Sequence, residues 1–170
     1  MKRLTILFFI IILSLTGCSN DNRYENIQKK INKQGYKTKL EREAGIEVDH
    51  IKVVNETLEF IFSVNRDTKK ISQYSFDFAY SASGSSNPLI YEVENKKMIG
   101  LVIGVGGEAY NCAYNLDKNK EDVRILTDGC SDAEIELIDS IKKLHDLALE
   151  DLNITSEEFI EWAQWYSDNN

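Results

Sequence analysis

The sequence has few of the residues on which catalytic and metal-binding sites depend. Its 170 residues include only two histidines, three cysteines and one proline. His50 and His145 lie in neither a His-x-x-x-His nor a Cys–His spacing, and the serines of segment 81–86 lack a Gly-x-Ser-x-Gly elbow. We therefore expect no metal, no cofactor and no catalytic residue, and we predict that the protein is not an enzyme.

Basic residues are also in the minority. The chain carries 20 Lys and Arg residues against 28 Asp and Glu residues, which gives a formal net charge of -8. Nucleic-acid binding needs a basic footprint, so we expect no nucleic-acid partner. With 42% hydrophobic residues and only nine glycines, the composition also argues against extensive disorder.

Two segments approach known ligand motifs without meeting their requirements. Ile103 to Ala109, "IGVGGEA", has the glycine spacing of a dinucleotide site, but the residues that follow do not form a helical pattern. The alternative function is a small solute-binding domain or an envelope-modifying enzyme domain with a shallow pocket near Gly104–Gly107. Asp117 to Asp128 approximates a calcium loop, yet Asp122 stands where glycine is needed, which favours a solvated hairpin turn.

The one long hydrophobic run lies at the start of the chain. Lys2 and Arg3 precede an apolar segment from Leu4 to Leu15. About 12 residues span roughly 18 Å as a helix, which is short against a hydrocarbon layer of roughly 30 Å. This is the length of the hydrophobic region of a signal peptide.

The residues that end this run, Leu15-Thr16-Gly17-Cys18, resemble the lipobox of bacterial lipoprotein precursors. The resemblance implies cleavage between Gly17 and Cys18, attachment to the Cys18 thiol of diacylglycerol with acyl chains such as palmitate, and a place on the extracytoplasmic face of the cell membrane. The abundance of Asn, Lys and Ile is similar to that of lipoproteins from Gram-positive bacteria. An ordinary secretory signal and an uncleaved anchor are the alternatives.

The predicted organisation is a removed signal peptide, 1–17, a lipidated cysteine with a short tether, 18–23, and one globular domain, 24–170. Charge is polarised along the mature chain. Residues 23–42 carry a net charge of about +5 and residues 121–170 about -11. This asymmetry favours an orientation with the basic end toward the membrane, although solvated surface helices explain it equally well.

The pattern of apolar residues predicts an α+β fold. A short helix is expected over 24–34, and from Ile46 onward the period becomes two, with clear alternation over 58–64. We expect five to seven antiparallel strands in meander order. Capping boxes at Ser131 and Thr155 predict two C-terminal helices. Their expected apolar stripes are Leu137, Ile141, Leu144 and Ala148, and Phe159, Trp162, Ala163 and Tyr166.

Three further residues are candidates for structural or binding roles. Cys112 and Cys130 would be the only other cysteines of the mature chain, and a disulfide between them would stabilise the fold by roughly 3 kcal/mol. A reduced pair and a redox pair are the alternatives. Trp165 lies at the edge of the last apolar stripe, where an exposed ring would anchor a partner. We thus predict a non-enzymatic, membrane-anchored module that binds a protein or peptide.

Overall fold

The computed structural model describes residues 19–42, 44–79, 86–103, 112–116 and 130–170. A helix, α2 (Ser19–Lys33), precedes the sheet, and two helices, α3 (Asp132–Leu152) and α4 (Ser156–Asn169), follow it. The seven strands are β1 (Lys37–Glu41), β2 (Val48–Val54), β3 (Leu58–Asn65), β4 (Ile71–Phe78), β5 (Leu89–Glu92), β6 (Lys97–Val102) and β7 (Cys112–Asn115). The predicted α+β fold is confirmed.

The strands lie side by side in chain order, each antiparallel to the next, as a meander requires. Asparagine side chains close the first two turns after β2. Asn55 Oδ1 accepts hydrogen bonds from the backbone N–H groups of Thr57 and Leu58, at 2.8 and 2.7 Å. Asn65 Oδ1 accepts equivalent bonds from the N–H groups two and three residues ahead. These side chains imitate a backbone turn, which explains why the chain reverses where the strand pattern breaks.

One face of the sheet forms the core. Along β3, Phe60, Phe62 and Val64 are buried, while the residues between them point to the opposite face and are half-buried. The largest fully buried side chains are Trp162, Tyr74, Phe60, Phe62, Phe76, Phe159, Ile31, Ile51, Leu89, Ile138, Ile141 and Leu152. The core is therefore an aromatic layer between the sheet and the helices.

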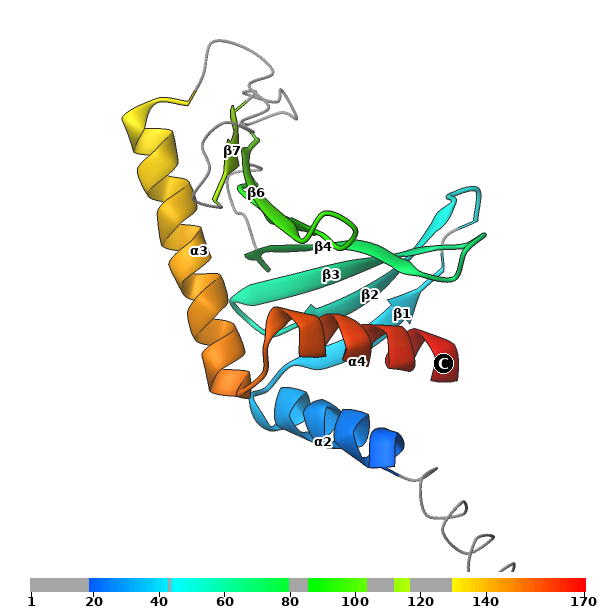
Figure 1. Ribbon diagram of the computed structural model, residues 1–170. Coiled ribbons are helices and arrows are strands. Elements are labelled where there is room, and N and C mark those ends of the chain that lie inside the picture. Colours follow the sequence, from blue (N-terminus) through cyan, green and yellow to red (C-terminus); the bar gives the residue numbers. More distant parts are fainter. Residues whose placement is uncertain (1–18, 43, 80–85, 104–111, 117–129) are drawn as a thin grey trace, which may run out of the picture.

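The helices divide the covered face of the sheet among them. In Figure 1, α4 crosses β3 and β4, α3 runs along β5 to β7, and α2 lies beside α4 at the edge of the molecule. The capping boxes expected at Ser131 and Thr155 are both present, and each fixes the direction in which its helix leaves the preceding loop.

Gly100 permits the closest approach between a helix and the sheet. A Cβ atom built on Gly100 would lie 2.2 Å from Cγ2 of Ile138 in α3. Ile138 is almost fully buried, and its branched side chain has few alternative rotamers in a helix. The absence of a side chain at this position of β6 therefore allows α3 to pack directly on the strand.

The structure corrects the predicted face of α3. The buried residues are Ile138, Ile141, His145, Ala148, Leu149 and Leu152. Ile141 and Ala148 were expected there, but Leu137 is 38% exposed and Leu144 is only partly buried. The helix is rotated relative to the predicted stripe because β6 accepts Ile138 above Gly100.

Two other differences concern the beginning of the domain. α2 begins at Ser19, five residues before the predicted helix start at Tyr24, so the expected tether after Cys18 is helical from its first described residue. Strand β1 was not predicted. Its sequence, "KTKLE", is mostly charged because β1 is an edge strand, and lysines on an edge oppose unwanted pairing with other strands.

Candidate functional site

Several predicted site residues lie outside the described part of the chain. These are Gly17 and Cys18 of the lipobox, Gly104–Gly107, and the loop Asp117–Asp128. Their predicted roles stay predictions. None of the helices in the described ranges combines the length and the apolarity that crossing a membrane requires.

Cys130 lies at the entrance to α3 and is disulfide-bonded. Its side chain packs against the hydrophobic core from the edge. The side chain of Cys112 at the start of β7 is not described, so the pairing with Cys112 stays a prediction.

Trp165 is half-buried rather than the exposed anchor that its place in the sequence suggested. Its ring stacks on Tyr24 of α2, with the ring centroids 5.9 Å apart and an interplanar angle of 27°. Both rings pack against the core. The described contacts therefore give Trp165 a structural role, because it joins α4 to α2.

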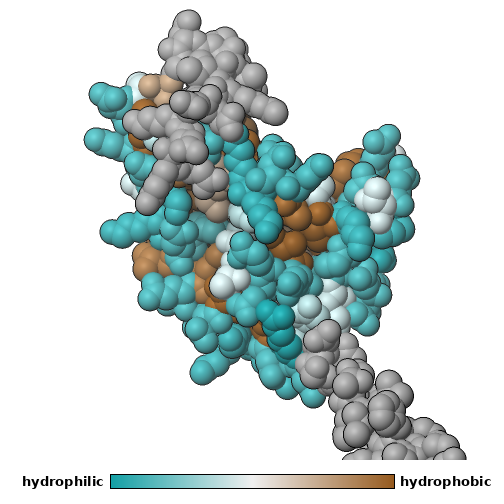
Figure 2. Space-filling view, in the orientation of Figure 1, coloured by the Kyte–Doolittle hydropathy of each residue, from teal (hydrophilic) through white to brown (hydrophobic). Residues whose placement is uncertain are grey.

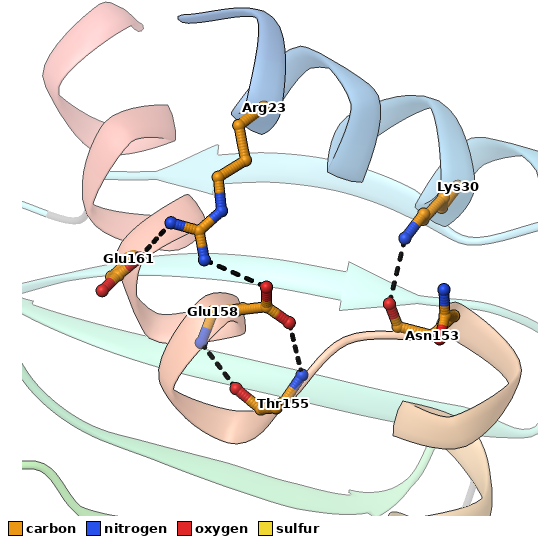
Figure 3. A network of polar contacts seen from close by, with 6 residues as sticks. All are labelled: Arg23, Lys30, Asn153, Thr155, Glu158 and Glu161. Atoms are coloured by element: carbon orange, nitrogen blue, oxygen red, sulfur yellow. Dashed lines mark hydrogen bonds and ion pairs between the residues drawn. The ribbon is translucent and has the colours of Figure 1, made fainter. Parts of the chain in front are cut away.

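Two ion pairs also join α2 to α4 (Figure 3). Arg23 of α2 donates to Glu158 of α4 at 3.0 Å and lies 3.2 Å from the carboxylate of Glu161. Glu158 also accepts the backbone N–H of Thr155 at 2.9 Å, which completes the capping box. This backbone hydrogen bond, with help from Arg23, lowers the pKa of Glu158. One carboxylate thus caps α4 and holds α2.

At the other end of α2, hydrogen bonds join it to the end of α3. Lys30 Nζ donates to the backbone carbonyl oxygen of Asn153 at 2.9 Å, and the Gln34 side chain donates to that of Asp151 at 3.1 Å. Asn153 adopts a left-handed conformation as the C-cap of α3. α2 therefore satisfies backbone acceptors that the end of α3 leaves without partners in its own helix.

His145 lies at the centre of a buried polar network that sequence reasoning missed. Its ring is 1% exposed and stacks on Tyr74, with Phe60 and Phe76 nearby. Nε2 lies 2.8 Å from the Tyr74 hydroxyl, and Nδ1 lies 3.0 Å from a carboxylate oxygen of Asp146. His145 and Tyr74 lie within the core, while the Asp146 side chain is 54% exposed, so the network runs from the core to the surface of α3.

Burial lowers the pKa of His145, although the neighbouring Asp146 acts in the opposite direction. Burial also raises the pKa of Tyr74. For Asp146, burial opposes ionisation, but hydrogen bonds from Lys142 and His145 prevail and lower its pKa. Neutral His145 therefore carries its proton on Nδ1, which donates to Asp146, and its Nε2 accepts a hydrogen bond from the Tyr74 hydroxyl, which also contacts Ser156 Oγ at 3.3 Å.

This arrangement predicts that the domain loses stability in mild acid. Unfolded His145 has a pKa of about 6.5, and the folded value is lower, so below that pH the unfolded state binds more protons than the folded state. The free energy of unfolding should fall by up to about 1.4 kcal/mol per pH unit from this residue. Urea unfolding at a series of pH values measures the slope. The His145→Gln variant should lack this contribution; an equal slope in both proteins would contradict the assignment.

His50 lines an open hollow of about 580 Å³ on the uncovered face of the sheet. The other lining residues are Lys39, Leu40, Glu41, Arg42 and Lys52. Glu41 accepts ion pairs from Lys39 and Lys52 at 3.0 and 2.9 Å, which lower its pKa. Arg42 lies 3.6 Å from Asp49, so each of these three cations already has a carboxylate partner.

A row of leucines runs along the outer side of α3. We call Leu137, Leu144 and Leu147 the leucine stripe; spacings of seven and three residues place them on one side of the helix. Leu137 and Leu147 are 38% and 46% exposed, and Leu144 is partly buried. Figure 2 shows hydrophobic side chains exposed along α3 within a mainly hydrophilic surface. The stripe adjoins the buried face of the helix and extends it into solvent.

Carboxylates surround the leucine stripe. Exposed Glu136 and Glu150 lie on the solvent side of the stripe, Asp151 lies at its end, and Lys143 is the basic residue among them. The last turn of α3 holds no basic residue. Residues 132–170 contain eleven Asp and Glu residues but only two lysines. The stripe is therefore an apolar strip in a strongly acidic surface.

The described residues contain no group of three His, Cys, Asp or Glu side chains placed to hold a metal ion. A search of protein-family models, of curated proteins and of solved structures found no match to this chain.

Proposed function

We propose that this protein is a lipid-anchored module on the outer face of the cell membrane that binds a protein or peptide partner without catalysing a reaction. The lipobox-like Leu15-Thr16-Gly17-Cys18 supports the anchor. The exposed leucine stripe of α3 carries the binding part of the proposal, since neighbouring apolar side chains that form one patch in a hydrophilic surface mark interaction sites.

The position of the stripe agrees with this role. α3 is held firmly, by direct packing on Gly100 at one end and by the α2 contacts of Asp151 and Asn153 at the other. A rigid helix presents its outer side chains in a fixed arrangement, which lowers the entropy cost of binding. Partner contacts should therefore centre on the middle of α3, between Leu137 and Leu147.

Amine-directed crosslinking in membranes of the native host tests the proposal, because Lys143 lies beside the stripe. We expect wild-type protein to crosslink a partner through Lys143. The Leu137→Gln and Leu147→Gln variants should each reduce that crosslink about fivefold or more, as expected for a residue at the centre of an interface.

The matched control is Ile46→Gln, since Ile46 is 40% exposed and precedes β2, far along the chain from α3. This variant should crosslink like wild type. A crosslink that survives both leucine substitutions would contradict binding through α3. If the crosslink disappears only with Trp165→Ala, the α2–α4 junction is the binding surface instead.

A further inference from the structure

The geometry of the leucine stripe restricts what it accepts. Leu137 and Leu147 are ten residues apart, which corresponds to about 15 Å along a helix. The backbone of α3 is hydrogen-bonded internally, so it offers no edge for an added strand. At 3.6 residues per turn, Leu147 lies about 80° around α3 from Leu137, and a row that curves gently in this way fits the apolar face of another helix crossing α3.

The charges beside the stripe restrict the partner further. Glu136, Glu150 and Asp151 outnumber Lys143, and the carboxylates of the last turn add to the negative end of the helix dipole. Lys30 donates to the Asn153 carbonyl at that end, but it is held on the α2 side. Cationic side chains on the partner would offset an unfavourable concentration of negative charge near Leu147.

The same charges disfavour other occupants. A second copy of α3 would place carboxylates against carboxylates, which opposes self-association through this face. An anionic lipid surface is repelled for the same reason. Residues 1–17 are removed under the proposed processing and are not available to cover the stripe.

We infer that the leucine stripe of α3 binds a basic amphipathic helix, whose apolar face covers Leu137, Leu144 and Leu147 and whose lysines or arginines lie against Glu136, Glu150 and Asp151. This inference rests on the proposed function and names the chemistry of its partner. Burial of the leucines supplies affinity, and the surrounding carboxylates select the sign of the partner's charge.

The test uses two synthetic helical peptides with the same leucines, one with lysine and one with glutamate at every polar position. Each is about 18 residues long, since shorter helices are marginal in water, and carries a photo-crosslinker on its apolar face. The lipoprotein is placed in zwitterionic nanodiscs, with empty nanodiscs to subtract binding to lipid. We expect the lysine peptide alone to bind, with crosslinks mapping to α3 and affinity falling as salt rises.

Two kinds of variant separate the contribution of the leucines from that of the carboxylates. Leu137→Gln and Leu147→Gln should each weaken lysine-peptide binding by about tenfold, while Ile46→Gln should not change it. Glu150→Lys retains the leucines and should shift preference toward the glutamate peptide. Equal binding of both peptides, or crosslinks away from α3, would overturn the inference. If neither peptide binds while the Lys143 crosslink in native membranes persists, the partner chemistry is wrong and the proposed function stands.

Discussion

The Cys18→Ala variant is expected to lose its lipid and to disappear from the membrane fraction as mature protein. Diacylglycerol attachment needs the thiol, and two acyl chains hold a protein on a bilayer far more firmly than one. Without them, the acidic domain has no comparable membrane affinity. Metabolic labelling with palmitate, followed by separation of membranes from soluble material, measures both effects. Labelling should fall to background, with the protein either uncleaved or released.

Ser19→Ala is the matched control, because it changes the adjacent residue and retains the thiol. It should remain labelled and membrane-bound. Unchanged labelling of Cys18→Ala would show that the lipid is attached elsewhere. A wild-type protein that carries no label and stays in the membrane at precursor size would favour the uncleaved anchor that the sequence left open.

The Gly100→Ala variant is expected to destabilise the domain by about 3 kcal/mol, near the upper end of overpacking effects. The added Cβ would lie 2.2 Å from Ile138 Cγ2, so α3 or β6 must move. Ile138 cannot give way easily, because the branched side chain is almost fully buried and restricted in its rotamers. Denaturant unfolding measures the loss.

A double-mutant cycle with Ile138→Ala isolates the clash. Ile138→Ala alone removes a buried side chain and should cost about 2–5 kcal/mol. In that background the added methyl group has space, so Gly100→Ala should cost little or even stabilise the protein. The coupling energy should then be about 3 kcal/mol, with the double variant more stable than the sum of the two single changes predicts. Additive effects would contradict the close packing of α3 on β6.

Features with a local cause could be predicted from the sequence. The alternation along β3, the turn at Asn55 and the two capping boxes depend on residues within a few positions of each other. Trp162 was expected in the core and is fully buried there. The connection of neighbouring strands into a meander followed from short turns, which allow few other arrangements.

The rotation of α3 could not be predicted, because it depends on a partner distant in sequence. The helix has apolar residues over a wider arc than one contact needs, and Gly100 on β6 determines that Ile138 turns inward rather than Leu137. The surplus of leucines on an acidic helix was a visible signal of the leucine stripe. Leu137 and Leu144 were expected in the core because both continue the helical spacing of Ile141 and Ala148.

The burial of His145 and of Trp165 could not be predicted either, because it depends on residues distant in the sequence. A lone histidine on a helix gave no sign that Tyr74 and Asp146 would enclose it in a network. A tryptophan at the edge of a stripe gave no sign that Tyr24, near the start of the chain, would cover it. In both cases burial was set by a residue more than 70 positions away.

The mass of the intact protein extracted from its own membranes tests the central claim most directly. The account predicts a mature chain that begins at Cys18, lacks residues 1–17 and carries the added mass of diacylglycerol on that residue. Fragmentation should place the addition on Cys18. An unmodified chain, or one that retains the segment Met1–Gly17, would contradict the lipid-anchored module proposed for this protein.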